Sequence, residues 1–386
     1  MTTGVAALRG LSPPVKVFAA ATGAGAGVQA ALWSVPGSSA FVAGAAFPYA
    51  PHEIERFLGF TPARFCDTDA ALELAVAAYV RARETCLAEE AAGTGAGALG
   101  LGLTASVASL VAHRGDHRVF AATLSARGAV VWSARLPKGT GEAQRSFDGG
   151  FADRLGVHAL LAAAGIAGDA EAAPGVEVTR RDAGEAELRA LLFRRPAFGP
   201  GDARAAVTAA AMRDCVLMPG SFDPCHDGHA MLADAVERQV GRRVVYALTA
   251  DPVHKPRLRV VDVLDRVASV RRHRDAARAI LLTERDPLFI DKARQFPGAG
   301  IAIGADALVR MLDPAWGPRI SEMLAEFRAL GTRFYVAGRM LGGRWTTTDD
   351  VAIPGAFKDL FTAIDGRHDA SSSALRRQRD TAGSER

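Results

Sequence analysis

Residues 15–165 alternate between short apolar runs and stretches with helical spacing. Runs typical of buried strands occupy 15–20, 40–46, 99–107, 119–124 and 129–134, and helical spacing occupies 28–34 and 70–88. This alternation of strands and helices predicts an α/β layered domain. The glycine-rich stretch 93–97 predicts a flexible break inside it.

The pattern weakens over 168–211, where prolines and glycines interrupt it, so we expect a connector with one short helix at 185–193. Beyond it, strand-like runs occur at 215–218, 244–249, 279–283, 300–303 and 333–337. Because helical stretches separate these runs, a doubly wound, Rossmann-like parallel sheet is predicted. The expected organisation is an α/β domain at 1–167, a connector at 168–211 and a second α/β domain at 212–386.

The composition is that of a globular protein with enough apolar residues for two cores. The chain has 386 residues, of which 49% are hydrophobic, and this length favours two domains. The formal net charge is only +4, and charges of both signs are mixed outside a basic tail, so no nucleic-acid partner is expected. No apolar run reaches membrane-spanning length and no signal pattern is seen, so we expect no membrane association and a cytoplasmic location. The four cysteines contain no C-x-x-C pair and suit a reducing compartment.

The stretch 220–229 is the most informative motif, because it places two imidazoles at a predicted strand-to-helix turn. His226 and His229 are three residues apart and would project from one face of the first helical turn. The free N–H groups and the positive dipole end of a helix start favour phosphate binding. Gly228 and Gly220 would allow close backbone approach and a tight turn.

Three further segments carry groups suited to a nucleoside triphosphate. Lys255 follows one predicted strand, and Asp306 follows another. Three serines and an arginine near the C-terminus, Ser371, Ser372, Ser373 and Arg376, would form a second anion clamp at a helix start. Taken singly, each segment is also compatible with ordinary turn or tail chemistry. Their joint occurrence at strand ends, in this order, favours a triphosphate site.

These segments resemble the motifs of the HxGH nucleotidyltransferases, and most closely those of the nicotinate/nicotinamide mononucleotide adenylyltransferases. Residues 220–229 match the family pattern G-x-F-D-P-x-H-x-G-H at every fixed position. Residues 252–255 are similar to its P-x-H-K element, 304–308 to G-A-D-S-L, and 371–376 to I-S-S-[ST]-x-I-R without the first Ile. The resemblance covers roughly 214–380.

The resemblance implies adenylyl transfer from ATP to a small phosphorylated acceptor, with Mg²⁺ bridging the phosphates and no dedicated protein ligands for the metal. It implies catalytic roles for His226, His229, Lys255 and Arg376, and acceptor contacts for Trp316 and Lys255. The positions implied to bind ATP are Gly220, Ser221, Phe222, Asp223, Gly228, Gly304, Asp306, Ser371, Ser372 and Ser373.

Two departures from the family pattern leave the acceptor open. Trp316 lies about two residues later than the family's stacking tryptophan, and 286–297 does not resemble the usual bacterial enzyme. Adenylyl or cytidylyl transfer to another phosphorylated acceptor is therefore an alternative. A non-catalytic pyridine-nucleotide sensor or assembly protein is a third.

The first domain resembles the CinA C-terminal domain, a family of nicotinamide mononucleotide deamidases, through Val35-Pro36-Gly37-Ser38-Ser39 and Tyr49. In this alignment Thr22 holds the position of the nucleophilic serine, and Ile54 holds that of the expected lysine. A nucleophile needs a nearby base or cation, so the resemblance implies a degenerate deamidase-like domain. It would serve as a dimerising or docking domain, or keep a pocket for a pyridine nucleotide, and we expect a homo-oligomer.

Overall fold

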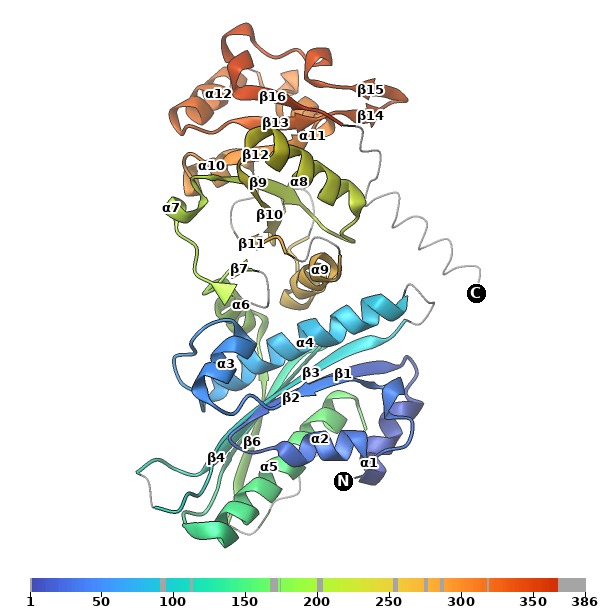
Figure 1. Ribbon diagram of the computed structural model, residues 1–386, viewed down its shortest axis with the longest axis vertical. Coiled ribbons are helices and arrows are strands. Elements are labelled where there is room, and N and C mark those ends of the chain that lie inside the picture. Colours follow the sequence, from blue (N-terminus) through green and yellow to red (C-terminus); the bar gives the residue numbers. More distant parts are fainter. Residues whose placement is uncertain are drawn as a thin grey trace. The chain divides into compact units, whose positions relative to one another are not determined.

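The computed structural model describes residues 2–90, 95–111, 114–166, 173, 175–199, 204–252, 256–273, 277–284, 288–317 and 319–366. The chain forms two compact units (Figure 1). The first comprises Met1–Arg194 and Val260–Ala268, and the second comprises Arg195–Arg259 and Ser269–Arg386. None of the described helices is long and apolar enough to cross a membrane.

The first unit is built on a six-stranded sheet in the order β2-β1-β3-β4-β5-β6, in which β2, β1 and β3 run parallel and the other pairs antiparallel. Its strands are β1 (Val15–Thr22), β2 (Val42–Ala46), β3 (Gly97–Ser106), β4 (Arg118–Ser125), β5 (Gly128–Arg135) and β6 (Glu177–Ala183). Its helices are α1 (Thr2–Ala6), η1 (Ala7–Gly10), α2 (Ala26–Trp33), η2 (Ser38–Ala40), α3 (Pro51–Leu58), α4 (Thr68–Glu90), α5 (Gly141–Ala163) and α6 (Glu185–Phe193).

Both faces of this sheet are covered, as the apolar alternation along β1 requires. Val17, Ala19 and Ala21 join a core cluster with residues of α2 and α5. Ala20, which points to the other face, packs with residues of α3 and α4. Figure 1 shows α4 across one face and α2 and α5 across the other.

The second unit is built on an eight-stranded sheet in the order β16-β13-β12-β9-β10-β11-β7-β8. The six strands from β16 to β11 are parallel, and β7 and β8 add an antiparallel edge. The strands are β7 (Ala197–Phe198), β8 (Arg204–Ala205), β9 (Cys215–Gly220), β10 (Arg243–Thr249), β11 (Ile280–Thr283), β12 (Gly300–Gly304), β13 (Phe334–Ala337) and β16 (Phe361–Ile364). This architecture confirms the predicted doubly wound parallel sheet.

The helices of the second unit are α7 (Ala209–Met212), α8 (Asp227–Val240), α10 (Phe289–Gln295), α11 (Ala305–Met311), η4 (Pro314–Trp316), α12 (Arg319–Ala329), η5 (Thr348–Asp350) and η6 (Gly355–Leu360). A small hairpin, β14 (Arg339–Leu341) and β15 (Arg344–Thr346), follows β13. Helix α9 (Val260–Arg272) contributes residues to both units. Apolar side chains of α10, α11 and α12 pack on β12 and β13, where Ile301, Phe327 and Phe334 are fully buried.

The segment 168–211 contains more regular structure than its sequence pattern predicts. Helix α6 forms as expected, but β6 extends the first sheet, and β7 and β8 extend the second. Strand β6 is mostly exposed and polar, and β7 and β8 have two residues each. Such edge strands carry no apolar alternation from which they could be recognised.

Candidate active site

The site predicted in the second unit lies where the strand order of the parallel sheet reverses. From β9 the sheet continues through β10 and β11 on one side and through β12, β13 and β16 on the other. Paired residues of β9 and β12 end at Leu217↔Ile301, short of the carboxyl ends of both strands. We call the place between these two carboxyl ends the switch point. Nucleotides bind at this place in doubly wound sheets.

His226 and His229 stand at the start of α8, which follows β9 directly. His226 is the N-cap residue, with extended backbone at φ −147° and ψ 167°. Its N–H donates to Nδ1 of His229 at 3.2 Å, and the His229 N–H donates to the His226 carbonyl at 2.9 Å. The two rings stack with centroids 3.8 Å apart. The structure therefore brings the two predicted imidazoles together as one unit.

The residues before α8 form the support for His229. Phe222 is fully buried, and its ring centroid lies 4.9 Å from His229 and 4.8 Å from Tyr246. Its φ of 46° lies in the left-handed region, which a non-glycine residue adopts only where its surroundings hold it. A Cβ at Gly220 would come within 2.8 Å of the Phe222 ring, so this strand end must be glycine.

Burial sets the protonation state of both histidines. Burial is the largest cause that lowers the pKa of His226 to about 4 and that of His229 to about 3. The positive charge of Arg339 contributes to both lowered values, and the charge of His226 contributes to that of His229. His273 also lowers the two values, whereas Asp227, which pairs with His273 at 3.3 Å, raises that of His226. Both rings are therefore neutral near pH 7. Because Nδ1 of His229 accepts a hydrogen bond, its proton is on Nε2.

Nδ1 of His226 has no hydrogen-bond partner among the described residues, although the residue is only 8% exposed. A buried ring nitrogen without a partner is costly unless a ligand satisfies it. This orphaned atom, the Nε2–H of His229 and the start of α8 are groups that can bind phosphate.

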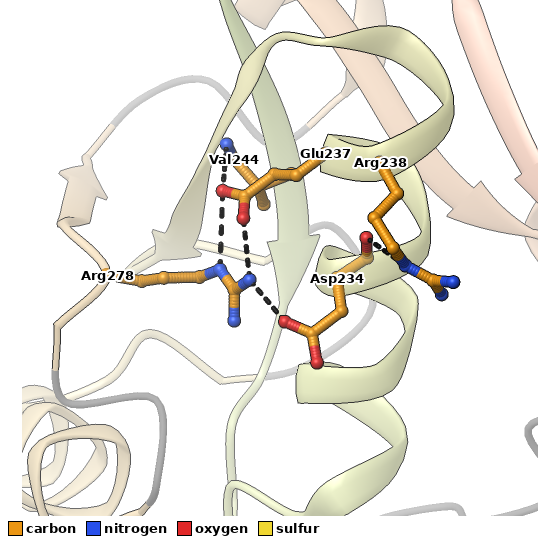
Figure 2. A network of polar contacts seen from close by, with 5 residues as sticks. All are labelled: Asp234, Glu237, Arg238, Val244 and Arg278. Atoms are coloured by element: carbon orange, nitrogen blue, oxygen red, sulfur yellow. Dashed lines mark hydrogen bonds and ion pairs between the residues drawn. The ribbon is translucent and has the colours of Figure 1, made fainter.

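Helix α8 is fixed to the sheet by the polar network in Figure 2. Nη2 of Arg278 donates to Asp234 at 2.6 Å and to Glu237 at 2.7 Å, both on α8. Glu237 in turn accepts the Val244 N–H of β10 at 2.9 Å. The arginine side chain is only 12% exposed. Since α8 carries the histidines, this network also fixes the helix on which they stand.

The structure places Thr22 and Ile54, the two residues that the resemblance aligned with a deamidase site in the first unit. Thr22 ends β1 and is the register partner of Thr104 in β3. Thr22 is only 4% exposed. Ile54, at the lysine position, is 5% exposed and lies in the apolar cluster beside α4. No cation is therefore supplied by position 54.

A cavity of about 500 Å³ lies elsewhere in the first unit, at the start of α5. Its lining residues are Tyr49, Ser109, Leu110, Val111, Gly141, Glu142 and Arg145. Arg145 donates to the Ala108 carbonyl at 2.8 Å and to the Tyr49 hydroxyl at 3.1 Å. Tyr49, which matches the CinA-like pattern in the sequence, therefore lines this cavity. Thr22 is not among the lining residues.

Comparison with known protein families concerns the C-terminal part of the chain. Residues 217–378 match the family described as cytidylyltransferase-like. The second unit carries a cytidylyltransferase-like domain. The match begins within β9 and includes the histidine pair, and it supports nucleotidyltransferase activity in general terms.

The chain is also similar to solved structures of other proteins. The competence or damage-inducible protein from Enterobacter asburiae is 14% identical, and the match covers 42% of this chain and 95% of that one with a TM-score of 0.30. The CinA superfamily protein from Escherichia coli is 14% identical, with 42% and 86% covered and a TM-score of 0.28. No curated protein matches the chain significantly.

The remaining predicted residues lie at several places in the cytidylyltransferase-like domain or outside the described residues. Gly304 is the N-cap of α11, and Asp306 lies in the first turn of that helix, paired with Arg310 at 3.1 Å. Ser221 and Asp223 lie in the partly buried turn between β9 and α8, and Gly228 is buried in the first turn of α8. Lys255, Ser371, Ser372, Ser373 and Arg376 and the side chain of Trp316 lie outside the described residues.

Sequence reasoning missed Arg339, which the structure places at this site. Arg339 begins β14, two residues after β13 ends. Its guanidinium lies over Gly304 and acts on the pKa of both histidines. One feature of the sequence could have indicated Arg339: it lies just after the predicted strand 333–337. The carboxyl ends of parallel strands commonly supply ligand-binding residues.

Proposed function

We propose that this chain transfers an adenylyl group from ATP to nicotinate or nicotinamide mononucleotide and releases pyrophosphate. The observation that carries the proposal is the pair of stacked, neutral histidines at the switch point, with one buried ring nitrogen unsatisfied. Neutral imidazoles at a helix start can donate to phosphate oxygens and gain positive charge once an anion is bound.

The choice of acceptor is supported by sequence motifs around this site. Residues 252–255 and 304–308 resemble elements of the pyridine mononucleotide adenylyltransferases. Asp306, at the start of α11, is suited to accept from a ribose hydroxyl. Lys255 would hold a phosphate and Trp316 would contact the pyridine ring.

The reaction needs no covalent enzyme intermediate. A phosphate oxygen of the acceptor attacks the α-phosphorus of ATP, and the bond to the β-phosphate breaks as pyrophosphate leaves. His226 and His229 would hold the triphosphate and stabilise charge in the transition state. Ser372, Ser373 and Arg376 would hold its far end.

Mg²⁺ is part of the proposal because it neutralises phosphate charge. In the described part of the chain, no group of three or more His, Cys, Asp or Glu side chains could hold a metal ion. In the proposed reaction the phosphates of ATP would supply several of the Mg²⁺ ligands, as is usual for Mg²⁺ in nucleotide sites.

The test is a substrate panel. Purified protein with Mg²⁺ is given ATP or CTP together with nicotinate mononucleotide, nicotinamide mononucleotide or other phosphorylated acceptors, and pyrophosphate release is followed. Turnover of ATP with a pyridine mononucleotide is the expected result. If both pyridine mononucleotides stay unreacted while another acceptor turns over, the acceptor assignment is wrong.

Cytidylyl transfer is the second candidate, favoured by the match to the cytidylyltransferase-like family and by the late position of Trp316. A nucleotide sensor is a third, and it would bind ATP without any turnover. The panel separates the two transfer reactions, because it tests both nucleotides with each acceptor. A separate measurement of ATP binding identifies the sensor, which would bind ATP without releasing pyrophosphate.

For the first unit we propose ligand binding or self-association in place of deamidation. Thr22 is buried and Ile54 is apolar, which argues against Thr22 as a nucleophile activated by a cation at position 54. The open hollow lined by Tyr49 and Arg145 is where we propose that a small molecule would bind. A homo-oligomer formed through this unit remains a proposal, to be tested by measuring the mass in solution.

A further inference from the structure

Arg339 follows β13, a strand that does not border the switch point. Strand β13 is separated from β9 by β12. The guanidinium nevertheless lies over the end of β12, because residue 304 has no side chain. A Cβ at Gly304 would lie 2.9 Å from Nε of Arg339 and 2.5 Å from Oδ1 of Asp306. A side chain at 304 would therefore displace the arginine or Asp306 from these positions.

The positive charge of Arg339 also acts on the residues that follow β9, on the other side of the switch point. It contributes to the lowered pKa of His226 and of His229, which follow β9. An arginine cannot lose its proton at any working pH. Arg339 is therefore a permanent cation of the site, beside two imidazoles that are neutral when no anion is bound.

The hairpin β14–β15 holds Arg339 in this place. In its register Met340 faces Trp345, so Trp345 and Arg339 lie on opposite faces of the hairpin. On its own face, Trp345 packs against Gly338, where a Cβ would lie 2.5 Å from the indole ring. The tryptophan thus fixes the hairpin from one side while the arginine projects from the other.

The proposed reaction brings two anions together, because an acceptor phosphate must approach the α-phosphate of ATP. Positive charge that is already in position reduces the repulsion between them. We propose that Arg339 binds the phosphates at the point where the new bond forms, as a catalytic residue of the site. This inference rests on the proposed function. The acceptor oxygen bonds to the α-phosphorus, the electron pair of the broken bond leaves with pyrophosphate, and Arg339 keeps its proton throughout.

The test compares Arg339→Ala and Arg339→Lys with Arg344→Ala. Arg344 lies in the same hairpin and is 77% exposed in its side chain, so it is a matched control. We expect kcat to fall on the order of 10²–10³-fold in Arg339→Ala and less in Arg339→Lys, with Arg344→Ala unchanged. Added guanidinium ion should partly restore kcat in Arg339→Ala, which a purely structural role of Arg339 would not allow.

Binding of Mg·ATP, measured by calorimetry without any acceptor, separates this inference from the function on which it rests. Arg339→Ala is expected to bind Mg·ATP more weakly than wild type. If wild type turns over a pyridine mononucleotide and both Arg339 variants match it in kcat and ATP affinity, this inference fails alone. If no acceptor reacts but ATP affinity still depends on Arg339, the proposed function fails and the phosphate contact stands. If wild type does not bind ATP, both fail.

Discussion

At the level of single residues, His229 is the side chain on which the candidate site most directly depends. Its Nδ1 accepts the N–H of His226 at 3.2 Å, and its ring rests on the buried ring of Phe222. These contacts fix its tautomer and its orientation before any nucleotide binds. Catalysis by positioning requires such preorganisation, because a misplaced donor loses most of its effect.

Removing this ring should greatly slow transfer without unfolding the chain. In His229→Ala we expect the rate of pyrophosphate release to fall on the order of 10²–10³-fold, the usual effect of losing one charge-stabilising donor. Circular dichroism should match wild type, and His52→Ala, an exposed histidine of α3, is the control for activity. A rate near that of wild type in His229→Ala would contradict the active-site assignment.

The same residue makes stability depend on pH. Burial is the main cause that lowers the pKa of His229 to about 3 in the folded chain. Below about pH 6.5 this histidine therefore binds a proton in the unfolded chain but not in the folded chain. Stability is therefore lost as pH falls from about 6.5 toward 3, with a slope of about 1.4 kcal/mol per pH unit for each such histidine. Urea unfolding at pH 7, 6 and 5 should show a shallower dependence in His229→Asn than in wild type or His52→Ala. Equal slopes in all three proteins would refute this.

The sequence predicted the histidine pair but not Arg339, and the reason is physical. His226 and His229 belong to one short segment, so their spacing alone places them on one helical turn. Arg339 reaches the site only because Gly304, in another strand, leaves space for it. A contact that depends on which strands are neighbours is not visible in local spacing.

At the level of elements, the apolar patterns predicted most of both sheets. The expected strands at 99–107 and 244–249 correspond to β3 (Gly97–Ser106) and β10 (Arg243–Thr249). Strand order could not be predicted, because it depends on long-range pairing. Edge strands were missed where their residues are polar, as in β6, whose positions are mostly exposed. The buried, central elements that carry the histidines were thus the ones that sequence could predict.

Helix α8 offers a test at this scale, because Arg278 donates to two carboxylates of this helix (Figure 2). Removing Arg278 leaves Asp234 and Glu237 as neighbouring carboxylates without their common cation. We expect Arg278→Ala to lower the free energy of unfolding by about 1–3 kcal/mol. The matched control is Arg238→Ala, whose side chain donates to the Asp234 carbonyl of its own helix at 3.2 Å. Denaturant unfolding measures both, and equal stability of the two variants would contradict this role for Arg278.

At the level of the whole molecule, the two units differ in the chemistry that their sites retain. The second unit keeps paired imidazoles and a permanent cation at its switch point. In the first unit, the residue at the position of the expected lysine is buried in an apolar cluster. A side chain in that environment contributes to packing, since a buried unpaired charge is too costly to keep there.

The first unit should therefore release no ammonia from nicotinamide mononucleotide, and Thr22→Ala should not alter that result. Restoring the lysine should not create activity, because Ile54 is only 5% exposed and packs against Leu58 and Leu74. We expect Ile54→Lys to destabilise the first unit by several kcal/mol, whereas Ile54→Leu should cost less than about 1.5 kcal/mol. Ammonia release and thermal unfolding measure the two effects. Deamidation by wild type that is lost in Thr22→Ala would show that the buried threonine still acts as a nucleophile.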